Sequence, residues 1–179
     1  MVLQFDTNQD TYSGYLLCGP TQCTLNQACV QDLCVTRGSL SFTAEWSRDD
    51  GRGYIIVRSP LNDTIYYGHP TSNSSLDDGQ HEEVGNGTEV DNIYWPLNST
   101  VPKGIYSICF STGSLFTGND TSPVTVIIEI RRFQYAIETM TRTFNMSTKD
   151  LSECNQNSDT YIGSYATGMF SHRLKCREY

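Results

Sequence analysis

Six asparagines of this chain stand in the tripeptide that accepts N-linked oligosaccharides, Asn-X-Ser/Thr without Pro at X. They are Asn62, Asn73, Asn86, Asn98, Asn119 and Asn145. With 11 Asn among 179 residues, the Ser and Thr content would give roughly two such tripeptides by chance. Asn-rich turns of any β protein also generate them. The excess nevertheless predicts a secreted, densely glycosylated protein.

The seven cysteines favour the same compartment, because disulfides persist in oxidising surroundings. Four of them have the spacing C-x4-C-x5-C-x4-C, which suits a small knot of two disulfides. These are Cys18, Cys23, Cys29 and Cys34. Structural zinc is the alternative, but its sites favour C-x2-C pairs, which this segment lacks. For the other three we expect a disulfide between Cys154 and Cys176 and a buried thiol at Cys109.

Six carboxylates are concentrated between residues 77 and 91, and hard oxygen ligands of this kind bind calcium. They are Asp77, Asp78, Glu82, Glu83, Glu89 and Asp91. No EF-hand spacing is present, so a solvated acidic loop is the alternative interpretation. Apart from covalent glycans and this calcium candidate, we expect no cofactor.

The residues that usually carry catalysis are scattered along the chain. His69, His81 and His172 are far apart, and His81-Glu82-Glu83 lacks the second His of a zinc-protease helix. Neither G-x-S-x-G nor a Cys with an obvious His partner occurs. We therefore expect a protein that is not an enzyme.

The composition excludes two further classes of protein. The chain has 20 acidic and 12 basic residues and a net charge of −8, whereas nucleic-acid binding requires a basic face. The longest apolar runs, YIIV at 54–57 and VTVII at 124–128, are far too short to cross a bilayer. We expect neither a nucleic-acid partner nor a membrane span.

The middle of the chain has the alternation of β-strands. Between residues 39 and 46, Leu40, Phe42, Ala44 and Trp46 point to one face, which is the period of a half-buried strand. Further strands are expected at 53–59, 64–67, 92–95, 104–111, 124–131 and 135–144, with a bend or turn near Arg132. Short strands separated by Gly-, Pro- and Asn-rich turns predict an all-β fold, an antiparallel β-sandwich.

We divide the chain into an N-terminal extension at 1–17, a disulfide knot at 18–38, a sandwich at 39–145 and a Cys-containing C-terminal tail at 146–179. Both terminal parts carry strand-like apolar segments outside the sandwich, and we expect something to hold them. Trp46 and Trp95 are expected in the core. A sugar-stacking platform is the alternative for these aromatic rings.

Short motifs follow one another in a particular order between residues 41 and 110: W-x3-D, Y-I-I-V-x-x-P, I-Y-Y-G, L-D-D, D-N-I-Y-W-P and P-x-G-x-Y. This order resembles secreted bacterial β-sandwich modules related to the pre-peptidase C-terminal domains. The resemblance implies a non-catalytic accessory module that supports adhesion, secretion or carbohydrate contact. Where that family has an acidic D-x-D-L, this chain has Gly51-Arg52-Gly53-Tyr54, which removes those carboxylates as metal ligands.

The four-Cys segment resembles truncated EGF-like modules, in which the first Cys pairs with the third and the second with the fourth. The resemblance implies disulfides between Cys18 and Cys29 and between Cys23 and Cys34.

Two functions fit these observations. The first is a glycosylated structural subunit of a pilus-like fibril, which polymerises head to tail by lending the terminal strand at 1–17 to the open sheet edge of the next copy. The alternative is a monomeric adhesion module that binds carbohydrate or calcium. Both functions place the protein outside the cell or at its surface.

Overall fold

The fold is all-β and antiparallel, as the alternation predicted. We describe a computed structural model over residues 15–48, 51–84, 90–116, 122–145, 148 and 153–168. These residues form thirteen strands, and all their pairings are antiparallel. No helix within these ranges is long and apolar enough to cross a membrane.

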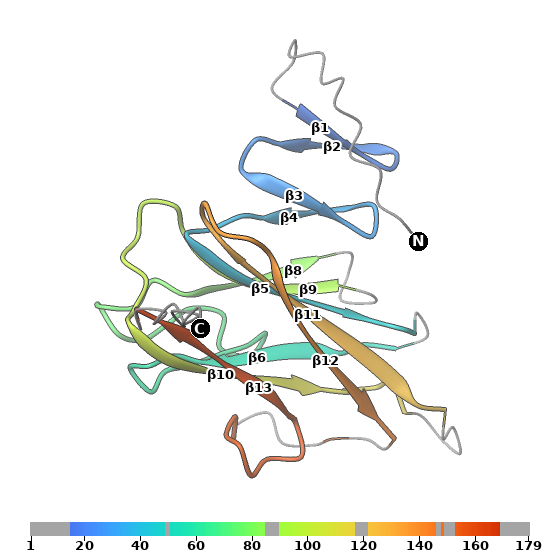
Figure 1. Ribbon diagram of the computed structural model, residues 1–179. Helices are drawn as coiled ribbons and strands as arrows, with labels where there is room; N and C mark the ends of the chain where they lie inside the picture. Colours follow the sequence, from blue (N-terminus) through green and yellow to red (C-terminus); the bar gives the residue numbers. More distant parts are fainter. Residues whose placement is uncertain are drawn as a thin grey trace, which may run out of the picture.

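Nine strands form two sheets that make up a sandwich (Figure 1). The five-stranded sheet has the order β12-β11-β5-β9-β8, with β5 at Leu40–Trp46, β8 at Gln80–Val84, β9 at Val90–Trp95, β11 at Val124–Arg132 and β12 at Glu138–Phe144. The four-stranded sheet has the order β13-β10-β6-β7, with β6 at Tyr54–Arg58, β7 at Thr64–Ile65, β10 at Gly104–Ser111 and β13 at Tyr161–Thr167.

The core lies between the two sheets and is rich in aromatic side chains. The alternating residues of β5 point into it, and Phe42 contacts Trp95 edge to face, with 5.9 Å between the ring centroids. Trp95 also meets Tyr106 of the other sheet at 5.1 Å. Trp46 and Trp95 are only 4% and 0% exposed. Both are therefore core residues, and the sugar-platform alternative is wrong for them.

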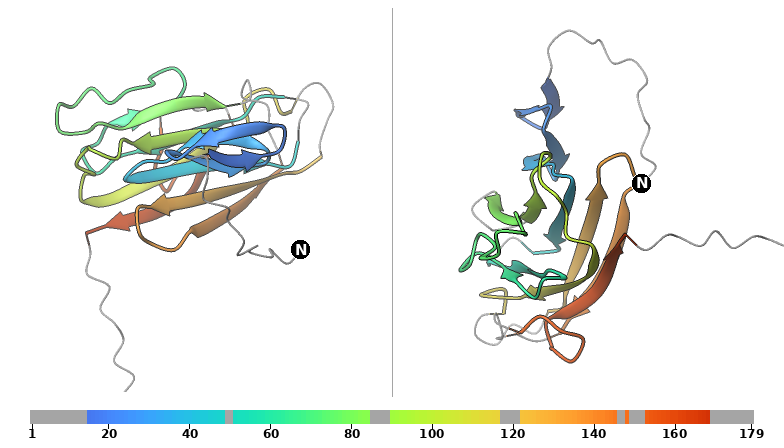
Figure 2. Two further views of the ribbon diagram at one scale, coloured as in Figure 1. Left: turned by 90° about the horizontal axis from the view of Figure 1, so that it is seen from above. Right: turned by 90° about the vertical axis from the view of Figure 1, so that its left-hand side faces the viewer.

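The N-terminal knot consists of two stacked hairpins, with β1 at Tyr15–Cys18, β2 at Thr21–Thr24, β3 at Gln27–Val30 and β4 at Leu33–Thr36. Its disulfides join Cys18 to Cys29 and Cys23 to Cys34, the pairing that the EGF-like resemblance implied. The second hairpin packs its apolar side on Val84 of β8 and Val90 of β9. The knot therefore stands on the five-stranded sheet and projects from it (Figure 2).

The C-terminal region differs from the prediction. Cys154 forms a disulfide with Cys109 of β10, so the expected buried thiol at Cys109 and the expected bond from Cys154 to Cys176 are wrong. Cys176 itself lies outside the described residues. The reason is that β13 pairs with β10 and becomes an edge strand of the sandwich, which brings the loop before it onto the outer face of β10. The predicted sandwich of 39–145 therefore gains a strand from the predicted tail.

The N-terminal extension is also shorter than predicted. Residues 15–17 belong to β1, which pairs with β2 inside the knot, so they are not a detached donor strand. Residues 1–14 of the predicted extension lie outside the described part of the chain.

Candidate functional site

The four described sequon asparagines all lie on exposed turns or next to strand ends. Asn62 is in the turn that follows β6, Asn73 is in the loop before β8, Asn98 follows β9 and Asn145 follows β12. Such positions are accessible to the transferase that adds glycans. The sequons at Asn86 and Asn119 lie outside the described residues, and occupancy of all six remains a prediction.

Five of the six acidic residues that were predicted to bind calcium lie in the described part of the chain, and Glu83 of β8 is the cross-strand partner of Asp91 on β9. Glu82 and Glu83 are neighbours in β8 and point to opposite faces, because successive side chains of a strand alternate. Asp77 is buried, and its Oδ1 accepts the indole N–H of Trp95 at 2.7 Å. In the described ranges, the one cluster of possible metal ligands is Cys18, Cys23 and Cys34, whose sulfurs are in disulfides. Calcium binding by the acidic residues stays a prediction; Glu89 lies outside these ranges.

Glu82 instead joins the knot to the sandwich. Its carboxylate accepts hydrogen bonds from the backbone N–H of Thr36 at 2.8 Å and from the Thr36 hydroxyl at 2.7 Å. The amide of Asn92 on β9 donates both to Glu82 at 2.9 Å and to the Thr36 carbonyl at 3.1 Å. The hydroxyl of Thr43, on β5, donates to Asn92 in turn. Thr43 is therefore buried, whereas the alternation predicted that only one face of this strand would be buried. This network fixes the end of β4, directly before Arg37.

His81 and Asp91 form a buried pair between the sheets. His81 Nε2 lies 2.8 Å from Asp91 Oδ1, and the two side chains are 5% and 2% exposed. Asp91 Oδ2 accepts the backbone N–H of Ile55 on the opposite sheet at 3.0 Å. Burial raises the pKa of the Asp91 carboxyl, and His81 partly opposes that effect. The pair connects β8 and β9 to the opposite sheet and is enclosed to an extent that leaves no accessible acid or base there.

His69 lies in a loop and is held by its neighbours. Its Nδ1 is 3.0 Å from the Thr64 carbonyl, and its Nε2 is 2.9 Å from the Asn73 amide nitrogen. His172 is outside the described residues. His69 and His81 are thus engaged in separate structural contacts.

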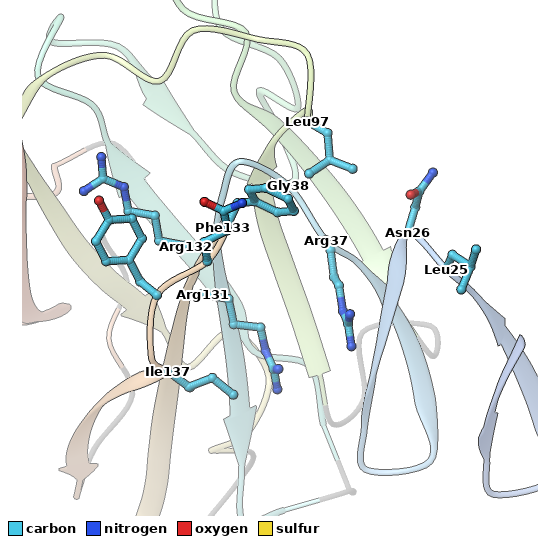
Figure 3. Close-up of a pocket in the computed structure, with 11 residues that line it drawn as sticks. Leu25, Asn26, Arg37, Gly38, Leu97, Arg131, Arg132, Phe133 and Ile137 are labelled. Carbon is cyan, nitrogen blue, oxygen red and sulfur yellow. The ribbon is translucent and has the colours of Figure 1, made fainter. Parts of the chain in front are cut away.

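A groove of about 430 Å³ opens between the knot and the tip of the β11–β12 hairpin (Figure 3). Its lining comprises Leu25, Asn26, Arg37, Gly38, Leu97, Arg131, Arg132, Phe133, Gln134, Tyr135 and Ile137. These residues come from the knot, the loop after β9 and the hairpin tip, which are distant in the sequence. The sequence analysis did not find this site.

The hairpin tip presents large apolar side chains to solvent. Its backbone is fixed, because the Phe133 N–H donates to the Ser39 carbonyl at 3.2 Å and the Tyr135 N–H donates to the Arg132 carbonyl at 2.9 Å. Phe133, Tyr135 and Ile137 are 61%, 65% and 51% exposed. Exposed apolar groups gathered in one place are typical of binding surfaces. The apolar turn sequence RRFQYAI is the signal from which this surface could have been predicted, because hairpin turns are usually polar.

Three arginines line the same groove as these apolar groups. The backbone N–H of Arg37 donates to the Asn26 carbonyl at 2.7 Å, and its exposed guanidinium has no partner among the described residues. Arg131 pairs with Glu129, while its buried Nε has no hydrogen-bond partner in the described part of the chain. Arg132 lies over the Tyr135 ring, 4.7 Å from its centroid. Figure 3 shows Arg37 and Arg131 extending in the same general direction from facing sides of the groove.

Gly38 is required for the position of Arg37. A Cβ at Gly38 would lie 2.0 Å from the carbonyl oxygen of Trp95, so a larger residue would push the chain away from β9. The next residue, Ser39, donates its N–H to the same carbonyl at 2.8 Å. The knot-to-sandwich connection is thereby held close to the sheet, and Arg37 is held at the groove.

The charge of the groove is opposite to that of the protein. Three of the 12 basic residues line it and none of the 20 acidic ones does, on a chain of net charge −8. A concave surface of one sign concentrates ligands of the other sign. Guanidinium groups donate in a fork that fits carboxylates and other oxyanions. The groove can therefore bind a segment or ligand that combines negative charge with apolar or aromatic groups.

No protein-family model, curated protein or solved structure matches this chain. The resemblance to pre-peptidase C-terminal-like modules therefore remains a prediction.

Proposed function

We propose that this protein is a non-catalytic extracellular structural glycoprotein whose subunits join head to tail through the groove. The observation that carries this proposal is the concentration of arginines and exposed aromatic rings in one groove of an otherwise acidic chain. The disulfides of the knot and the exposed sequons support a secreted protein. None of the four described sequon asparagines lines the groove, and Asn98 directly follows Leu97, which does.

The joint proposed here differs from exchange of a strand into an open sheet edge. The strand-like part of the C-terminal tail already pairs with β10 in its own subunit, and residues 15–17 pair within the knot. The core between the sheets is filled by side chains of the same chain. We therefore place the joint between subunits at the groove.

A second candidate function is a monomeric adhesion module that binds an acidic carbohydrate in the groove. It is favoured by the exposed rings of Phe133 and Tyr135 in the same groove as the guanidinium of Arg37, because aromatic faces stack on sugars and Arg binds their carboxylates or sulfates.

Charge reversal at Arg37 tests the proposal. Arg37→Glu removes an exposed guanidinium that has no described partner, so the fold should be unaffected. Lys103→Glu makes the same charge change at an exposed position outside the groove and is the matched control. A hydrogen bond to a charged group contributes about 1.5–3 kcal/mol, so Arg37→Glu should weaken self-association by roughly 10- to 150-fold.

The measurement is light scattering coupled to size exclusion over a range of protein concentrations, with electron microscopy of the native glycoprotein. We expect oligomers or fibres for the wild type and Lys103→Glu, and smaller species for Arg37→Glu. A wild type that stays monomeric at every concentration would exclude subunit joining. Retention of that monomer on an acidic polysaccharide, lost in Arg37→Glu, would then support the adhesion function.

A further inference from the structure

We infer that the groove receives residues 1–14 of this chain, an inference that rests on the proposed joining of subunits at the groove. The segment MVLQFDTNQDTYSG contains two acidic residues, Asp6 and Asp10, and no Lys or Arg. It also carries the aromatic residues Phe5 and Tyr12. This combination of carboxylates with apolar and aromatic side chains is the chemistry that the groove lining accepts.

The opposite end of the chain has the wrong charge for the same groove. Residues 169–179, MFSHRLKCREY, contain Arg173, Lys175 and Arg177 against one acid, Glu178, which is a net charge of 3 − 1 = +2. The corresponding charge of residues 1–14 is −2, from two Asp and no Lys or Arg. The groove arginines, of which Arg131 is already paired with Glu129, repel residues 169–179 and attract residues 1–14. Charge complementarity therefore selects the N-terminal segment as the occupant.

The point at which residues 1–14 join the described structure also favours them. Tyr15 begins β1 and pairs with Thr24, the last residue of β2. Leu25, which follows Thr24, lines the groove and is 75% exposed. The segment thus starts beside the knot wall of the groove. Fourteen extended residues span up to about 50 Å, which reaches the groove of the same subunit or that of a neighbour.

The same contact has different consequences in the two arrangements. Made within one subunit, it closes the groove and leaves a monomer. Made with a neighbour, it joins two copies through a heterologous contact that repeats without closing. The proposed structural function requires the second arrangement.

Photo-crosslinking in the full chain tests the occupant. Phe5 is replaced by p-benzoylphenylalanine, and the same probe at Leu76, which is 75% exposed and does not line the groove, is the control. Equal amounts of ¹⁴N- and ¹⁵N-labelled protein are mixed under dissociating conditions and allowed to reassemble before irradiation. We expect crosslinks from position 5, and not from position 76, to peptides that contain residues 25–37 or 131–137. Crosslinks that join the two isotopes identify contacts between subunits.

Charge exchange provides a second measurement. Asp6→Lys and Arg37→Glu should each reduce the position-5 crosslink at least 5-fold, and the double variant should restore most of it. A residue that acts only through the fold would not be rescued in this way.

The possible outcomes separate the inference from the proposed function. Crosslinks from position 5 outside the groove, with assembly still lost in Arg37→Glu, overturn the occupant but leave the groove as the joint. Groove crosslinks confined to one isotope support the occupant and overturn the joining of subunits. Crosslinks outside the groove together with no effect of Arg37→Glu on assembly overturn both.

Discussion

The Cys109–Cys154 disulfide provides a quantitative test of the fold, because it fixes how the C-terminal region joins the sandwich. Both cysteines are buried, at 0% and 1% exposure, and pack with Ile56 on the outer face of the four-stranded sheet. Replacing both with Ala opens a covalent loop whose ends are 45 residues apart. In the chain-entropy treatment, a loop of this length contributes about 4 kcal/mol to stability. This is a large part of the total stability of a domain.

The assay is urea-induced unfolding followed by tryptophan fluorescence, which reports on the two buried Trp residues. With a slope of about 2 kcal/mol per M, the Cys109→Ala/Cys154→Ala variant should unfold at a midpoint about 2 M lower than the wild type. Cys176→Ala is the matched control and should leave the midpoint unchanged. If Cys176→Ala instead causes the large loss, or if non-reducing peptide mapping joins Cys154 to Cys176, the structural pairing described above is refuted.

Three further predictions concern the core, a loop and the surface. Trp95→Phe should destabilise the protein by about 1.5–3 kcal/mol in urea unfolding, because it removes the N–H donor to the buried Asp77 carboxylate. Trp46→Phe should lower the free energy of unfolding by less, since the Trp46 Nε1 has no partner in the described residues. Equal losses of stability in the two variants would contradict this reasoning. Burial raises the pKa of Asp63, but hydrogen bonds from the Ser72 hydroxyl and two backbone N–H groups outweigh it and hold the pKa below 3.8. The stability that Asp63 contributes is therefore present above its unfolded pKa and lost as pH falls through the folded pKa. Asp63→Asn should melt at a lower temperature than the wild type at pH 7 and at the same temperature in stronger acid. A difference in melting temperature that persists in acid would exclude the Asp63 charge as its source. Intact mass before and after deglycosylation should show at least four of the six sequons occupied, and an unchanged mass would remove the main support for secretion.

Local patterns predicted the strands whose sequences alternate most clearly. The alternation at 39–46 gave β5 to within one residue, and the turn near Arg132 separates β11 from β12. Strand β8 was missed, because its sequence QHEEV is polar and was interpreted as part of an acidic loop. It is a strand because it pairs with β9 and because Glu82 and His81 find partners on opposite faces. Tertiary pairing overrides a weak strand propensity at such a position.

Residue types and spacing determined the fold class, the location of the core tryptophans, the sequons and, by resemblance, the pairing in the knot. These properties depend on periodicity or on cysteines close in the sequence, and both are local. The partner of Cys154 and the groove depended on which distant strands became neighbours. Pairing of β13 with β10 brought Cys154 to Cys109, and docking of the knot on β8 and β9 brought Arg37 to the hairpin tip. No short-range pattern encodes contacts between residues so far apart, because they form only when the sheets and the knot pack together.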